Sequence, residues 1–180
     1  MNLENKFEKV NTDCIYFNGY VPCIPHKERG VHCESCLEYK KIDKKILILK
    51  LGAAGEVLRC TPLLRKIKKE YPNSRIFWLT QYPELVPKND VFKIYNFTER
   101  EIELIKDVEF DIIYSLDKHE EIGALANQIN SKVKKGLNFV DISGFRDMVK
   151  NTNEFNIGNE AKRNHIILHG IEEYYRIIKT

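Results

Sequence analysis

Short apolar runs separated by amphipathic stretches dominate the middle of the chain. Runs typical of buried strands occupy residues 45–51, 75–79, 92–95, 111–116 and 132–137. Between the first two runs, Leu64, Ile67 and Tyr71 recur at helical spacing, and a second such series lies between the last two. The members of the second series are Ile122, Leu125, Ala126 and Ile129. Because strands that alternate with helices form βαβ units, we expect an α/β fold with a Rossmann-like parallel sheet.

The regions on either side of this alternation have a different composition. Residues 13–39 contain four of the five cysteines and few apolar runs, so they need a cross-link in place of a core. Residues 140–158 are rich in Asn, Gly and Ser and predict a loop, and residues 159–178 predict a final amphipathic helix. We therefore expect two parts, a cysteine-rich metal-binding extension over residues 1–39 and a Rossmann-like domain over residues 40–180.

The cysteines of the extension follow the pattern Cys14-x8-Cys23-x9-Cys33-x2-Cys36. The last two place two thiolates on one tight turn, as two corners of a tetrahedral metal site require. Zinc is the expected ion, an iron–sulfur cluster would use the same ligands, and His26 or His32 could replace one cysteine. A site with four protein ligands is closed, which indicates a structural role. The competing interpretation is that these are ordinary buried thiols.

Charge and hydropathy exclude several functional classes. The formal net charge is +3 and the basic residues are spread along the chain, so no nucleic-acid partner is expected. No run approaches the ~20 apolar residues of a transmembrane helix, although peripheral membrane association stays open. The first thirteen residues lack the apolar core of a signal peptide, which predicts a cytoplasmic protein. Clustered cysteines in that compartment favour metal binding over disulfides.

Candidate chemistry follows the first predicted strand, in the run Leu51-Gly52-Ala53-Ala54-Gly55-Glu56-Val57. Small residues at a strand-to-helix turn allow a ligand to approach the backbone, and the helix that follows presents unpaired N–H groups. The run matches neither the dinucleotide-binding fingerprint nor a Walker loop. Glu56 has two interpretations, either an acid that stabilises the first turn of a helix or a general base at the edge of a cleft.

The segment KILILKLGAAGEVLRCTPLLRKIKKEYPNSRIFWLT resembles the opening of glycosyltransferase family 9, the heptosyltransferase-like enzymes. The later stretch FDIIYSLDKHEEIGALANQI is similar to the fourth strand of that family and the helix after it. The extension is similar to one found on some members, so the resemblance covers most of residues 13–140.

The resemblance implies the N-terminal, acceptor-side half of a GT-B enzyme. Such an enzyme transfers a sugar from a nucleotide-sugar to a glycan or lipopolysaccharide-type acceptor, with inversion and without a metal in that step. The family's base is an aspartate, and Glu56 occupies that position with one more methylene. Residues Gly52, Ala53, Ala54 and Gly55 would form the floor of the acceptor site. Weaker candidates for binding an acidic acceptor are Lys50, Arg59, Asp117 and Lys118.

The family's donor-binding domain has no counterpart in this sequence. We therefore expect the chain to be inactive alone and to need a missing or separate donor domain that binds the nucleotide-sugar. The alternative is a non-catalytic, metal-containing binding or assembly module, in which the same surface would dock a partner chain.

Overall fold

A computed structural model describes residues 10–136, together with the backbone of residues 139–142 and 145–148. The chain divides into two compact units, Met1–Asp43 and Lys44–Thr180. The sequence had placed this boundary a few positions earlier, between residues 39 and 40.

The N-terminal unit has little regular structure. Its elements are the helix α1 (Ile24–Arg29) and the 3-10 turn η1 (Cys33–Ser35). Pro25 stands in the first turn of α1, and Gly30 ends the helix with a φ of 64°, a left-handed conformation that suits glycine. An antiparallel bridge joins Cys14 to Lys41, so the two ends of the described part of this unit lie side by side.

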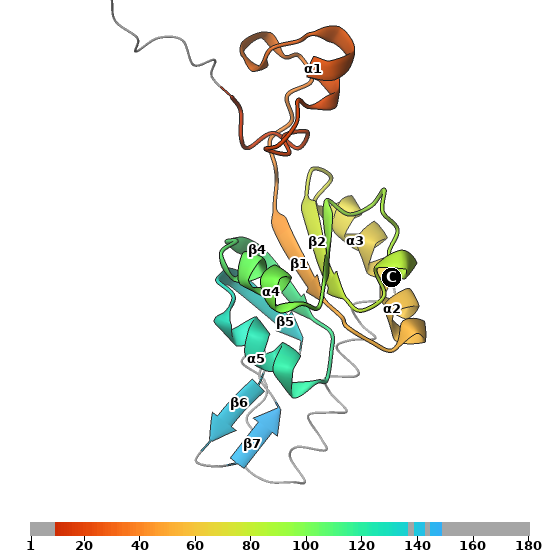
Figure 1. Cartoon of the computed structure of the whole chain (residues 1–180), viewed down its shortest axis with the longest axis vertical. Helices are drawn as coiled ribbons and strands as arrows, with labels where there is room; N and C mark the ends of the chain where they lie inside the picture. Colours follow the sequence, from red (N-terminus) through yellow and green to blue (C-terminus); the bar gives the residue numbers. More distant parts are fainter. Residues whose placement is uncertain (1–9, 137–138, 143–144, 149–180) are drawn as a thin grey trace, which may run out of the picture. The chain divides into compact units, whose positions relative to one another are not determined.

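The second unit is built on one parallel sheet (Figure 1). Its order is β3 (Lys93–Asn96), β2 (Arg75–Thr80), β1 (Lys45–Leu49), β4 (Phe110–Ser115), β5 (Ser131–Gly136). All four neighbouring pairs are parallel, with Ile48 aligned to Trp78 on one side and to Tyr114 on the other. This sheet confirms the predicted Rossmann-like α/β fold class, and each of its five strands overlaps one of the predicted runs.

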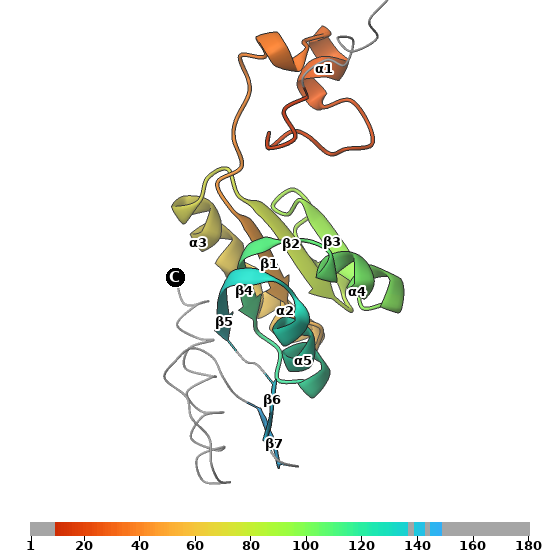
Figure 2. The same cartoon turned by 90° about the vertical axis from the view of Figure 1, so that its left-hand side faces the viewer.

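Helices cover both faces of the sheet (Figure 2). One core lies under α2 (Ala54–Cys60) and α3 (Pro62–Glu70) and includes Ile46, Ile48 and Trp78. The other lies under α4 (Glu99–Lys106) and α5 (Glu120–Gln128) and includes Leu47 and Leu49. Strand β1 is therefore buried on both faces, which explains its unbroken apolar run.

The structure also contains elements that the sequence analysis did not predict. Helix α4 and the 3-10 turn η2 (Pro83–Leu85) are new, and the hairpin β6 (Phe139–Ile142) and β7 (Phe145–Met148) contradicts the start of the predicted 140–158 loop. Antiparallel pairing of two short strands can arise in a segment of loop-like composition because it needs only a tight turn. The predicted helix over residues 159–178 lies outside the described residues. Within the described residues, no helix has the length and hydropathy needed to cross a membrane.

Candidate functional site

The candidate site lies where the direction of winding of the sheet reverses. From β1 the chain continues outward to β2 and β3, and then crosses back to place β4 on the other side of β1. The loops that follow β1 and β4 therefore emerge side by side at the carboxyl edge. In open α/β sheets this position is where ligands bind.

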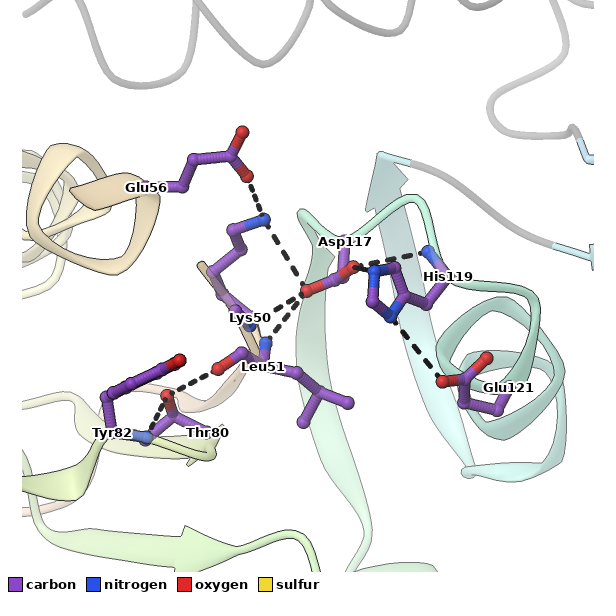
Figure 3. Close-up of polar contacts among 9 residues, drawn as sticks. Lys50, Leu51, Glu56, Thr80, Tyr82, Asp117, His119 and Glu121 are labelled. Carbon is purple, nitrogen blue, oxygen red and sulfur yellow. Dashed lines mark hydrogen bonds and ion pairs between the residues drawn. The ribbon is translucent and has the colours of Figure 1, made fainter. Parts of the chain in front are cut away.

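Lys50 follows β1 directly and lies inside the protein. Its backbone N–H donates to the carbonyl of Leu79, which continues the ladder between β1 and β2 by one residue. Only 3% of its side chain is exposed, and its Nζ donates to Glu56 Oε2 at 2.5 Å. The same Nζ lies 3.4 Å from Asp117 Oδ2. A buried ammonium is costly unless it is paired, and here it lies between two carboxylates (Figure 3).

Asp117 ties the two loops together. It follows β4 and is 1% exposed, and its Oδ2 accepts hydrogen bonds from the backbone N–H groups of Leu51 at 2.9 Å and Gly52 at 3.4 Å. Its Oδ1 accepts from the backbone N–H of His119 at 3.2 Å. One carboxylate thus fixes the start of both loops at the reversal point.

Glu56 is the more accessible partner of Lys50. It stands in the first turn of α2, and 45% of its side chain is exposed. Its backbone N–H donates to the carbonyl of Ala53, so the helix holds its main chain while Lys50 holds its carboxylate. A carboxylate that is oriented by a buried ammonium and still reaches solvent can accept a proton from a bound hydroxyl group.

The small-residue segment between Lys50 and Glu56 comprises a short loop and the first residues of α2, and it leaves space at its glycines. A β-carbon built on Gly55 meets nothing within 4 Å, and one built on Gly52 makes only ordinary contacts of 3.7 Å with Gln81 and Tyr82. Packing within the described residues therefore does not require glycine at either position. At the N-terminal end of this segment, the hydroxyl of Thr80 donates to the carbonyl of Leu51 at 3.2 Å.

Comparison with known proteins gives a limited set of similarities. No protein-family model matches the sequence, and no curated protein does either. Among solved structures, the E. coli heptosyltransferase WaaC with ADP aligns at 18% identity and a TM-score of 0.43, over 50% of this chain and 33% of its own. The same enzyme with ADP-2-deoxy-2-fluoro heptose aligns at 18% identity and 0.42, over 50% of this chain and 35% of its own.

A glycosyl transferase family 9 protein from Veillonella parvula aligns at 18% identity and a TM-score of 0.48, over 74% of this chain and 41% of its own. The chain therefore spans well under half the length of these proteins. At such low identity the similarity concerns the fold alone. The chemistry of the site therefore follows only from this protein's own residues.

Two of the residues suggested as binders of an acidic acceptor lie in the interior of the protein and not on its surface. Lys50 and Asp117 were expected to present charge to an acidic acceptor, but both are buried and bound to each other. Arg59 and Lys118 are exposed, and their role in acceptor binding stays a prediction. The sequence contained a signal for the ion pair of Lys50 and Asp117. A lysine inside the apolar run LILKLG needs a counter-charge if the run is buried.

The four cysteines predicted to bind metal lie in the other unit. They line one cavity there without forming disulfides, and His26 lies on the same wall whereas His32 is not among the lining residues. Across the described part of the chain, no three His, Cys, Asp or Glu side chains are close enough together to enclose an ion as they stand. The fifth cysteine, Cys60, is buried in the core under α2 and α3, as its helical position predicts.

Proposed function

We propose that the unit Lys44–Thr180 is the acceptor-side domain of a heptosyltransferase-like glycosyltransferase, with Glu56 as its general base. The observation that carries the proposal is the pairing of Glu56 with Lys50. A 45% exposed carboxylate is held at 2.5 Å by a buried ammonium, at the carboxyl edge where ligands bind in folds of this kind. The resemblance of residues 45–80 to family 9 glycosyltransferases suggests that this carboxylate acts as the base in sugar transfer.

The proposed reaction is an inverting displacement. The acceptor hydroxyl attacks the anomeric carbon of a nucleotide-sugar, the bond from that carbon to the diphosphate breaks, and the nucleoside diphosphate leaves. The hydroxyl proton passes to the carboxylate of Glu56. In this proposal Lys50 is a positioning residue, because it touches Glu56 and not the substrate.

The open space at Gly55, in the first turn of α2, supports the acceptor site. Since a β-carbon at Gly55 would meet nothing within 4 Å, the space above this residue can receive a sugar ring close to the backbone. The acceptor would be a glycan or a lipopolysaccharide-type saccharide, and the donor would sit in a second domain carried by another segment or chain. By itself this chain would then transfer no sugar.

The test is sugar transfer by this chain, alone and combined with a donor-type domain that is sought in the neighbouring coding sequence. ADP-heptose serves as the donor probe and lipopolysaccharide core oligosaccharide as the acceptor probe, with nucleoside diphosphate release as the readout. Glu56→Gln should lower the rate by about 10²–10⁴-fold, because the amide cannot accept the proton. Glu56→Asp keeps the carboxylate but withdraws it from Lys50, and should lower the rate by about 10–100-fold.

The matched control is Glu103→Gln, on α4, where an exposed glutamate pairs with Lys106. It should leave the rate unchanged. Full activity in Glu56→Gln would remove Glu56 from the mechanism. No transfer by any combination, together with a co-purifying partner chain, would favour the non-catalytic binding module.

A further inference from the structure

The N-terminal unit contains a partly open cavity of about 200 Å³ whose wall contains four cysteines. Residues that line it are spread over positions 10–39, and they include Cys14, Cys23, His26, Cys33 and Cys36. The cysteines are therefore gathered around one space by the fold, although the sequence separates the first from the last by more than twenty positions.

This unit has almost no apolar core in its described part. Between residues 10 and 43, only Cys14 and Pro25 are buried, and large apolar side chains such as Tyr20 and Leu37 are 96% and 101% exposed. A chain of this size that buries so little apolar surface does not stay folded without a disulfide, a metal or a partner.

Local hydrogen bonds bring the cysteines to the cavity but cannot replace that core. Ile15 donates to the carbonyl of Lys40 at 2.8 Å and Ile42 to that of Asp13 at 2.9 Å, which closes the two ends of the unit around Cys14. The side-chain amide of Asn11 donates to the carbonyl of Cys33 at 3.3 Å. Each such bond contributes about 1 kcal/mol net, which is small against the entropy of ordering the loops.

We propose that Cys14, Cys23, Cys33 and Cys36 bind one Zn²⁺ in this cavity, and that the ion stabilises the N-terminal unit in place of a core. Thiolates are the preferred ligands of Zn²⁺, four of them complete its tetrahedral shell, and the Cys33-x2-Cys36 pair brackets the single turn η1. The energy of binding the ion becomes folding energy, because the ligands are brought together only when the unit folds.

The thiols must move inward to reach Zn–S distances of ~2.3 Å, since in the described residues no three ligand side chains yet enclose an ion. Cys23 lies in the loop before α1, and Cys33 and Cys36 lie at the two ends of η1, so none of these three is held inside a strand or a long helix. His26 shares the wall but is not needed, because four thiolates fill the shell.

This proposal is independent of sugar transfer, and its test uses the full chain purified without chelators. Elemental analysis should find about one zinc per chain, and Cys33→Ser and Cys36→Ser should each lower the content at least about fivefold. Cys60→Ala, in the other unit, and His26→Ala should retain it. Zinc below about half an equivalent would overturn the proposal, and so would disulfides among the four cysteines or iron with acid-labile sulfide.

A second measurement covers the case in which the variants do not fold. Wild-type protein is stripped with a chelator, and hydrogen exchange is followed separately in residues 10–43 and 44–136. Loss of protection in the first segment alone, reversed by added Zn²⁺, is the expected result. Unchanged protection in residues 10–43 after complete removal of the metal would overturn the structural role.

Discussion

Lys50 Nζ donates to Glu56 Oε2 at 2.5 Å, and the two side chains differ sharply in exposure, 3% for the lysine and 45% for the glutamate. The pair therefore connects the protein interior with an open edge of the sheet. The buried end is fixed by Asp117, which is itself held by backbone N–H groups. The orientation of the exposed carboxylate thus depends on charges that are themselves buried.

Replacing Lys50 by methionine should be strongly destabilising. The variant keeps most of the side-chain volume but leaves the Asp117 carboxylate, 1% exposed, without its counter-charge. Loss of one partner from a buried ion pair costs about 3–5 kcal/mol in the free energy of unfolding. Chemical denaturation of the purified variant measures this change.

The matched control is Lys68→Met, since Lys68 pairs with Asp90 at 2.7 Å but both side chains are more than a third exposed. Its cost should stay within about 1 kcal/mol. The double variant Lys50→Met/Asp117→Asn should recover part of the loss, because it no longer buries a lone charge. A cost for Lys50→Met no larger than that for Lys68→Met would contradict this account of the pair.

The two glycines Gly55 and Gly136 should respond in opposite ways to alanine. A β-carbon on Gly55 meets no atom within 4 Å, and Ala is the better helix former in α2, so Gly55→Ala should leave stability unchanged or raise it by up to about 1 kcal/mol. Gly136 has a φ of 102°, and its β-carbon would lie 2.0 Å from the backbone oxygen of Ser115. Gly136→Ala should therefore lose at least about 2 kcal/mol.

Thermal and chemical unfolding of both variants test this contrast. If Gly55 lines the proposed acceptor site, Gly55→Ala should also raise the KM for the acceptor while the stability holds. Equal stabilities for the two variants would show that the backbone of Ser115 yields at little cost, contrary to the tight pairing of β4 with β5.

The sheet could be predicted from sequence because its strands are buried. Apolar runs such as residues 45–51 reach the interior on both faces and cannot be mistaken for surface segments. Helix α4 was missed because its apolar face is narrow, with Ile105 as its one buried residue. Its start was nevertheless marked, since the Thr98 hydroxyl accepts from the backbone N–H of Glu101 in the spacing of a capping box.

The site was only partly predictable. The small-residue segment and Glu56 could be singled out because both are local in sequence, although spacing alone favoured a helix-stabilising role for Glu56 and only the family resemblance suggested a base. The link from Lys50 to Asp117 joins the ends of β1 and β4, and it depends on those strands being neighbours, which the run of apolar residues does not specify. The cavity of the N-terminal unit was likewise only partly predictable. The spacing of the cysteines suggested four metal ligands, but only the fold shows that all four line one cavity.

Asp111 should make the stability of the second unit depend on pH. Burial alone would raise its pKa, but hydrogen bonds from Lys132 and from the backbone N–H of Lys45, with the charges of Lys132 and Lys44, outweigh burial and hold the pKa below its ordinary value. A carboxylate whose pKa is lower in the folded state stabilises the fold above the unfolded pKa of about 4. That contribution is lost as the pH falls through the folded pKa.

Asp111→Asn should therefore lower the free energy of unfolding by about 0.5–1 kcal/mol at pH 7. The loss is modest because the amide oxygen can still accept from Lys45, while Lys132, whose side chain is 67% exposed, forms a solvent-screened pair. Urea unfolding at a series of pH values should show the difference between wild type and variant shrinking below about pH 4. Lys132→Met should reproduce most of the loss at pH 7, and adding it to Asp111→Asn should change little more. A difference that stays constant down to pH 2 would assign the effect of Asp111→Asn to packing and not to charge.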